Sequence, residues 1–255
     1  MRPIKTHWPE IKKHLTCEVR ADPYAGYHLR QDFGGEALFY VRARHRGADV
    51  MRMHERSYGV EVWLEAQTDD ARALLRSLPS SPDLFLSLGS PLGLDLAQEE
   101  ITGRVTGNSL FCMVDRQTLR TAQTCPVSEV TENDREALHR YPPARNRDAF
   151  FRFLDEGKVN LWGCYEEGEI VGYAAAFRHD SMVAWVDVRP ELRRRGYGRS
   201  LLSAITTDLL RKHKVVFYDA CMDEMANSRL CLSVGFVPLR LMCYFTGKRK
   251  VSKRS

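Results

Sequence analysis

The clearest alternation of apolar and polar positions lies between residues 182 and 210. Residues 182–188 are apolar and rich in β-branched side chains, which is typical of a strand. From residue 201 onward, apolar side chains recur at helical spacing, which predicts a helix. Those side chains are Leu201, Leu202, Ile205, Leu209 and Leu210. Gly196 and Gly198 lie where this helix begins, so the pattern predicts a strand, a glycine-containing turn and a helix.

The rest of the chain after residue 126 continues this alternation. Strands are predicted at residues 127–130, 160–165, 170–178 and 215–220. Helices are predicted at residues 131–141, 150–157 and 227–234. The last of these helices ends at Gly235, where a glycine can adopt the left-handed conformation of a helix C-terminus. The pattern therefore predicts a mixed α and β domain around the glycine-containing turn.

The first half of the chain predicts a similar mixture. Strands are predicted at residues 36–41, 60–64, 84–88 and 109–114, and helices at residues 8–15 and 71–78. No glycine turn precedes the helix at residues 71–78. The polar segment 116–126 ends in proline and is the predicted boundary between two domains. We expect an N-terminal α+β domain over residues 1–120, a second domain over residues 126–247 and a basic, disordered tail over residues 248–255.

Charge and cysteine content exclude several classes of protein. The formal net charge is +5, and the tail holds five basic residues, so the body is close to neutral. No aromatic residues interleave with the basic residues of the tail, which favours a solvated segment over a nucleic-acid site. The seven cysteines are odd in number and include no C-x-x-C pair, so we expect neither a metal site nor a disulfide framework. No signal peptide or membrane span is predicted, and we expect a cytoplasmic protein with no membrane partner.

The turn at residues 193–199 has the composition of an anion site. Glycines let several backbone N–H groups converge on one point, and the positive end of the helix dipole adds to them. Three consecutive arginines precede Gly196 and can supply charge for a diphosphate or triphosphate. The alternative is a basic first turn that binds nothing, which opposes the helix dipole. A dinucleotide loop is disfavoured, because its third glycine position holds Leu201 here.

The same turn resembles motif A of the GNAT (GCN5-related N-acetyltransferase) superfamily. The matching run is Val188-x-Pro190-x-x-Arg193-x-x-Gly196-x-Gly198, and the resemblance extends over roughly residues 127 to 247. In that family the turn amides hold the pyrophosphate of acetyl-CoA, and the preceding strand bonds the pantetheine arm through its backbone. The resemblance thus implies main-chain contacts from Val186 and Val188. It implies a phosphate cradle made of Arg193, Arg194, Arg195, Gly196, Tyr197, Gly198 and Arg199.

The resemblance also implies a fold. It is an α/β (α+β) architecture, the GNAT fold, in which helices flank a central mixed and mostly antiparallel sheet. The N-terminal domain is then a degenerate GNAT-like copy, as in tandem and glycine N-acyltransferase-like members of the superfamily. The alternative is an unrelated α+β domain that shapes the acceptor site or a dimer contact, which leaves a homodimer open.

Catalytic candidates follow from the chemistry of acetyl transfer, in which an amine loses a proton and a thiolate gains one. Asp187 lies on the opposite strand face from Val186 and Val188 and is the nominated general base or amine anchor, with Asp219 as second choice. The alternative role of Asp187 is an ion pair with an arginine.

The acid toward the departing thiolate is harder to place. The helix predicted at residues 227–234 ends at Gly235-Phe236, which resembles the Gly-Phe pair that closes the family's last helix. Many family members have a tyrosine four residues before this glycine, and here that position is Cys231. Cys231 is the candidate acid, with Tyr244 or Tyr218 as substitutes and a role as apolar filler as the alternative. Many family members have an asparagine that contacts the cofactor at the position of Glu224. Asn227, three residues later, is therefore the candidate for this contact.

These expectations define an N-acetyltransferase that uses acetyl-CoA as donor. We expect a primary amine of a small molecule or amino acid as acceptor, attacking directly in a ternary complex. The alternative is a catalytically silent acyl-CoA-binding sensor, which the missing tyrosine favours.

Overall fold

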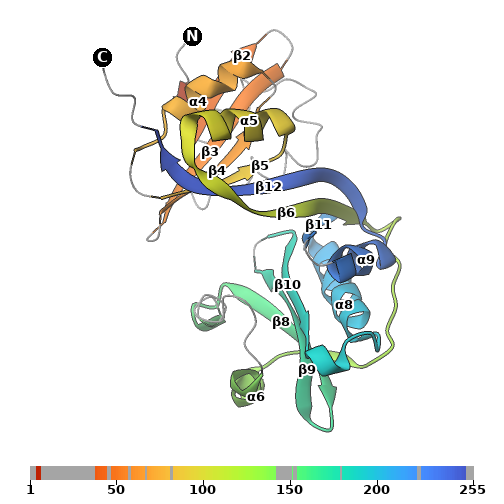
Figure 1. Cartoon of the computed structure of the whole chain (residues 1–255). Helices are drawn as coiled ribbons and strands as arrows, with labels where there is room; N and C mark the ends of the chain where they lie inside the picture. The colour runs from red at the N-terminus through yellow and green to blue at the C-terminus, as the bar shows by residue number, and fades with distance from the viewer. Residues whose placement is uncertain are drawn as a thin grey trace, which may run out of the picture. The chain divides into compact units, whose positions relative to one another are not determined.

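The computed structural model describes residues 4–6, 38–44, 47–56, 59–66, 68–80, 83–141, 151, 154–178, 180–222 and 225–250 (Figure 1). The helix predicted at residues 8–15 lies outside the described residues. The chain divides into two compact units. Unit 1 comprises Met1–Ser109 and Arg240–Ser255, and unit 2 comprises Leu110–Leu239.

Unit 1 is a sheet covered by two helices. Its elements are β1 (Ile4–Thr6), β2 (Leu38–Arg44), β3 (Gly47–Arg56), β4 (Gly59–Glu65), α4 (Arg72–Arg76), β5 (Leu84–Leu88), α5 (Pro91–Glu100), the first part of β6 (Ile101–Asp115) and most of β12 (Val237–Arg249). The strand order is β1-β2-β3-β4-β5-β12-β6, and β4 pairs with β5 in parallel from Val60↔Leu84 to Leu64↔Leu88. Leucines of both helices and alternate residues of the strands form one buried core, which fixes the register of these strands.

Unit 2 also contains paired strands, with helices on both faces of the sheet. Its elements are the end of β6, β7 (Val127–Glu129), α6 (Arg135–Arg140), β8 (Val159–Glu166), β9 (Glu169–Phe177), β10 (Met182–Val188), α8 (Tyr197–Lys212), β11 (Val215–Cys221) and α9 (Met225–Ser233). The strand order is β6-β11-β10-β9-β8-β7. Helices α8 and α9 lie side by side and bury one face of the sheet, and α6 packs against the other face (Figure 1). The predicted strand, turn and helix of residues 182–210 are confirmed.

Two elements of unit 1 differ from the sequence expectation. The charged stretch before residue 56 gave no clear prediction, and it forms the long strand β3 between β2 and β4. Helix α5 was not predicted, although its start carries ordinary signals. The Ser90 hydroxyl accepts a hydrogen bond from the Gly93 N–H at 3.1 Å, and Pro91 takes the first helical position.

The units also divide the chain differently from the predicted boundary at residues 116–126. The C-terminal strand belongs to unit 1, because Cys243–Gly247 pairs antiparallel with β5 and Phe245 is buried in the core of unit 1. Strand β12 runs to Arg249, so the first residues of the predicted disordered tail are part of the sheet. Residues 251–255 lie outside the described residues.

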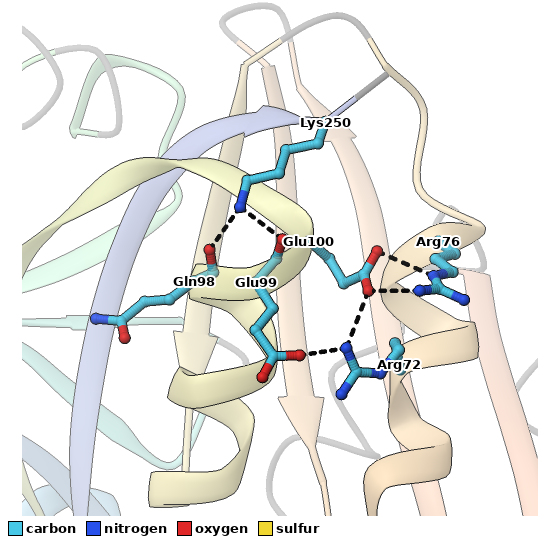
Figure 2. A network of polar contacts seen from close by, with 6 residues as sticks. All are labelled: Arg72, Arg76, Gln98, Glu99, Glu100 and Lys250. Carbon is cyan, nitrogen blue, oxygen red and sulfur yellow. Dashed lines mark hydrogen bonds and ion pairs between the residues drawn. The ribbon is translucent and has the colours of Figure 1, made fainter. Parts of the chain in front are cut away.

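A polar network fastens this last strand and joins the two helices of unit 1. Figure 2 shows the Lys250 Nζ donating to the carbonyl oxygens of Gln98 and Glu99, at 2.9 and 2.6 Å, where α5 ends. A cation at this position satisfies free carbonyl groups and complements the helix dipole. The Glu100 carboxylate lies between Arg72 and Arg76 of α4 and accepts hydrogen bonds from both. No helix of the described residues is long and apolar enough to cross a membrane.

Candidate active site at the start of α8

The turn between β10 and α8 requires glycine at residue 196. Gly196 has a φ of +93°, in the left-handed region that side chains with a Cβ disfavour. A Cβ added there would lie 2.3 Å from the Thr124 Oγ1, well inside van der Waals contact. The Thr124 hydroxyl is hydrogen-bonded to the Ser200 hydroxyl at 3.1 Å, and the Thr124 N–H donates to the same oxygen at 2.9 Å. Thr124 therefore packs against the turn at Gly196 and accepts no hydrogen bond from the backbone N–H groups of the turn.

The amides of residues 196–199 are available to a ligand. The first backbone hydrogen bond of the helix runs from the Ser200 N–H to the Gly196 carbonyl oxygen at 3.0 Å. The four preceding N–H groups have no acceptor in the part of the chain that the structure describes. Convergent N–H groups at the positive end of a sixteen-residue helix form an anion site.

The arginines of the turn have two different environments. The Arg193 Nε donates to the Val188 carbonyl oxygen at 3.0 Å, and its Nη2 lies 3.4 Å from the Asp187 Oδ1. The Arg199 Nη2 donates to the Ser233 carbonyl oxygen at 3.4 Å. Arg194 and Arg195 are exposed and form no ion pair with another described residue. The first pair therefore shapes the turn, and the second pair is free to meet an anion.

The two central strands of unit 2 separate next to this turn. Strand β10 pairs with β11 only at Met182↔Phe217 and Val183↔Tyr218. The pairing with β9 has a bulge between Val183 and Trp185 and then continues to Val188. Over its last residues β10 thus has no registered neighbour on the β11 side among the described strands. A backbone edge is left open inside a sheet, where an extended ligand can bind to it.

The main-chain groups of Val186 and Val188 point toward this open edge. The Arg189 N–H donates to the Val171 carbonyl oxygen of β9 at 2.9 Å, and antiparallel pairing alternates, so the even-numbered residues face away from β9. The groups of Val188 already have partners, because its N–H donates to the Asp187 Oδ1 at 2.9 Å and its oxygen accepts from Arg193. Val186 is therefore the better candidate for a main-chain contact with a ligand.

Asp187 belongs to a cluster on the face of the sheet that α6 covers. Its register partner on β9 is Tyr173, whose ring meets the Tyr141 ring edge-on at a centroid distance of 5.3 Å. The Arg189 guanidinium lies 5.8 Å from the centroid of the Tyr141 ring. Burial raises the pKa of both tyrosines, and the negative charge of Asp187 raises it further. Both phenols are therefore protonated at neutral pH and lie beside the Asp187 carboxylate.

Neither tyrosine was identified from the sequence. Tyr173 had a usable signal, because pairing the predicted hairpin 170–178 with the strand at 182–188 brings it opposite Asp187. Tyr141 had none, since it follows the last residue of α6 and only tertiary packing brings it here. The Tyr141 hydroxyl is buried and has no hydrogen-bond partner among the described residues.

The other predicted residues lie deeper or in unit 1. Cys231 is fully buried in the core between α9 and the sheet, and a hydrogen bond with Cys112, together with burial, raises its pKa. Asn227 accepts a hydrogen bond from the Tyr218 hydroxyl at 2.7 Å. Tyr244 belongs to unit 1, where the Ser109 hydroxyl lies 3.4 Å from its own. The roles predicted for these residues stay predictions. Within the described residues no cluster of His, Cys, Asp and Glu could hold a metal ion.

Comparison with known proteins gives this site a context. Residues 127–236 match the model of the acetyltransferase (GNAT) family. Comparison with curated protein sequences gives no match. Among solved structures, a Drosophila protein has a TM-score of 0.66 at 15% identity, covering 96% of this chain and 98% of its own.

Two further solved structures share the fold. A GCN5-related N-acetyltransferase from Sphaerobacter thermophilus has a TM-score of 0.59 at 16% identity, covering 98% of this chain and 96% of its own. A tandem GNAT protein from the clavulanic acid biosynthesis pathway has a TM-score of 0.53 at 12% identity, covering 85% and 84%. At these identities the likeness shows the fold, whereas the family model adds the class of protein, an acyltransferase. The family match covers residues 127–236, so this part of the chain is similar to the acetyltransferase (GNAT) family.

Proposed function

We propose that the protein transfers an acetyl group from acetyl-CoA to a primary amine of a small molecule or amino acid. The observation that carries this proposal is the combination of four available amides at residues 196–199 with the open edge of β10. The amides suit a diphosphate, and the strand edge suits the amide-containing pantetheine arm that leads from it. Arg194 and Arg195 add charge for the phosphates.

In the proposed reaction the donor thioester lies where β10 and β11 separate. The acceptor amine approaches from the face of Asp187, gives its proton to that carboxylate directly or through water, and attacks the thioester carbonyl carbon. The carbon–sulfur bond then breaks, and the thiolate takes up a proton. No acyl-enzyme forms, because the amine attacks the bound donor directly. Positioning of the two substrates supplies much of the rate increase.

The cluster around Asp187 supports its nomination as base or amine anchor. The Arg193 Nη2 lies 3.4 Å from its Oδ1. A carboxylate on this face can accept a proton from the amine or pair with an ammonium group. The protonated phenols of Tyr141 and Tyr173 can donate hydrogen bonds on the same face. Cys231, or in its place Tyr244 or Tyr218, remains the proposed acid, with Asn227 as a proposed cofactor contact.

A second candidate function is a catalytically silent acyl-CoA sensor. The observation that favours it is the burial of Cys231, which occupies the position of the family's acidic tyrosine and has its pKa raised. We propose a cytoplasmic protein in both cases, with no membrane or nucleic-acid partner and with a homodimer left open.

Calorimetric titration with acetyl-CoA, followed by a thiol-release assay with a panel of amines and amino acids, tests both functions. Binding with amine-dependent release of free coenzyme A is expected for the enzyme. Binding without release by any amine of the panel would favour the sensor. Absence of binding at millimolar acetyl-CoA would contradict both functions.

A further inference from the structure

Two cysteine side chains meet directly behind the turn that precedes α8. The Cys125 Sγ and the Cys164 Sγ are 3.0 Å apart, and both thiols are free. Cys164 lies on β8, where its register partner is Val127 of β7, two residues after Cys125. Sheet pairing therefore holds the two sulfur atoms together, although they are far apart in sequence.

These two thiols differ in exposure. Cys125 is half-buried, whereas Cys164 is fully buried. Burial raises the pKa of Cys164, and the hydrogen bond with Cys125 raises it further, so Cys164 keeps its proton. The S–H group of Cys164 can donate a hydrogen bond to the Cys125 sulfur. The accessible member of the pair, which an oxidant reaches first, is therefore Cys125.

We infer that Cys125 and Cys164 form a hydroperoxide-sensitive pair, in which Cys125 reacts first and Cys164 closes a reversible disulfide that weakens binding of the coenzyme at the adjacent turn. The thiol chemistry is independent of the proposed function, whereas the effect on the coenzyme rests on it.

The reaction balances with hydrogen peroxide as the oxidant. The Cys125 thiolate attacks one peroxide oxygen, the O–O bond breaks, and a sulfenic acid and one water form after proton uptake. The Cys164 sulfur then attacks the Cys125 sulfur, forming the S–S bond and expelling the hydroxyl group, which leaves as water with the Cys164 proton. Two thiols lose two electrons in total, and the peroxide is reduced to two waters.

The pair is mechanically connected to the anion site. The N–H groups of Thr124 and Cys125 both donate to the Ser200 hydroxyl, at 2.9 and 3.3 Å, and Thr124 fills the space beside Gly196. The Cys164 Sγ lies 3.9 Å from the Tyr197 carbonyl oxygen. A disulfide bond is about 2.05 Å long, so closing it draws the sulfur atoms together by about 1 Å. That movement displaces Thr124 from the position in which it supports the turn.

A second pair of neighbouring thiols serves as a control, because we do not expect peroxide to oxidise it. Cys112 and Cys231 are hydrogen-bonded to each other in the same unit, but both are fully buried. Peroxide has no accessible sulfur there, so this pair should stay reduced in folded protein. Cys221 and Cys243 are half-buried, as Cys125 is, and their oxidation reports whether peroxide reaches half-buried thiols in general.

Peptide mass spectrometry after a graded hydrogen peroxide treatment of the full chain tests the chemistry. We expect a disulfide between Cys125 and Cys164 at doses that leave Cys112 and Cys231 reduced, and its loss on adding dithiothreitol. Cys164→Ala should leave a Cys125 sulfenic acid that a dimedone probe traps, and Cys125→Ala should leave Cys164 reduced. Melting temperatures confirm that both variants are folded. Oxidation of Cys221 or Cys243 while Cys125 and Cys164 stay reduced in the wild-type protein would overturn the inference.

Calorimetric titration of coenzyme A into reduced and oxidised protein tests the connection to the turn. We expect affinity to fall by about fivefold or more on oxidation, to return with dithiothreitol and to be insensitive to peroxide in Cys125→Ala. A disulfide that leaves the affinity unchanged would overturn the connection alone. Failure of the reduced protein to bind coenzyme A would instead contradict the proposed function, with the mass-spectrometric result unaffected.

Discussion

Units 1 and 2 have the same order of elements, but only in unit 2 do two neighbouring parallel strands separate. Each has a run of antiparallel strands, then a helix, a strand and a second helix, in the order β2-β3-β4-α4-β5-α5 and β8-β9-β10-α8-β11-α9. In unit 1, β4 and β5 pair along their length, from Val60↔Leu84 to Leu64↔Leu88. In unit 2, β10 and β11 pair at two positions only. Continuous pairing uses up the backbone groups that the separated strands of unit 2 leave for a ligand.

The turns before α8 in unit 2 and α4 in unit 1 also differ, and only the first is suited to bind an anion. In unit 2 a left-handed glycine begins the sixteen-residue helix α8. In unit 1 a single 3₁₀ turn leads into the five-residue α4, with acidic Asp69 and Asp70 in front. Carboxylates at a helix N-terminus occupy the position that an anionic ligand would need. Unit 1 thus has the arrangement of the elements without the anion site.

The last strand of each run lies in the opposite unit. Helix α5 of unit 1 leads into β6, whose end lies beside β11 in unit 2. Helix α9 of unit 2 leads into β12, which pairs with β5 in unit 1. We propose on this basis that unit 1 is a degenerate copy of unit 2, with the final strands exchanged.

The largest expected loss of coenzyme affinity comes from placing a side chain at Gly196, the left-handed glycine that has no counterpart before α4 of unit 1. Gly196→Ala forces a Cβ against the Thr124 hydroxyl and displaces the turn amides together. Each charge-assisted hydrogen bond contributes about 1.5–3 kcal/mol, so we expect the affinity for coenzyme A to fall about 100-fold or more by calorimetry. Gly168→Ala is the matched control, because Gly168 also has a positive φ, of +81°, but has open space around it. Equal losses in both variants would mean that strain alone, and not the turn, controls binding.

A loss of similar size should affect turnover when the base is removed. Asp187→Asn keeps the shape of the side chain but cannot accept the amine proton. We expect kcat to fall by about 100-fold near neutral pH and the coenzyme affinity to stay unchanged, since general bases contribute about that much. The pH–rate profile should lose the limb that reports the base. Glu191→Gln, an exposed carboxamide variant on the same connection, should behave as wild type. An unaltered profile in Asp187→Asn would remove Asp187 from the mechanism.

A smaller effect is expected from the free arginines. Changing Arg194 and Arg195 together to alanine should lower the affinity for coenzyme A by about tenfold, because two charges that meet the phosphates are lost. The melting temperature should stay within error, since neither side chain has an ion-pair partner among the described residues. Arg211→Ala, at the exposed far end of α8, is the control and should not change affinity. The affinity of the double variant should also depend less on salt.

The smallest effect concerns the charge network of unit 1. Arg76 holds the pKa of Glu100 below its ordinary value of 4.5. Because the folded-state pKa is the lower one, this contribution to stability is present above about pH 4.5 and is lost as pH falls through the folded pKa. Glu100→Gln should cost about 1 kcal/mol of unfolding free energy at pH 7 and less in acid, by urea denaturation. Glu99→Gln, more exposed at 53%, should cost less, and coenzyme affinity should not change in either variant.

The sequence predicted the strand, turn and helix of the site because each depends on local pattern. Spacing located Gly196, and alternation along residues 182–188 put Asp187 on the face opposite Val186. The pattern could not predict which strands pair with each other, since periodicity identifies a strand but not its neighbour in the sheet. For that reason the exchange of β6 and β12, the nearness of Tyr141 to Asp187 and the meeting of Cys125 with Cys164 emerged only from the structure.

The most direct test of the anion site follows the glycine amides themselves. Protein labelled with ¹⁵N at glycine is titrated with coenzyme A, and the amide resonances are assigned with the variants Gly196→Ala, Gly198→Ala and Gly168→Ala. The two glycines of the turn should show the largest shifts, Gly168 should stay in place, and Gly59 and Gly93 of unit 1 should not respond. Saturable binding with shifts confined to unit 1, or with no shift at Gly196 and Gly198, would contradict the assignment of the turn as the diphosphate site.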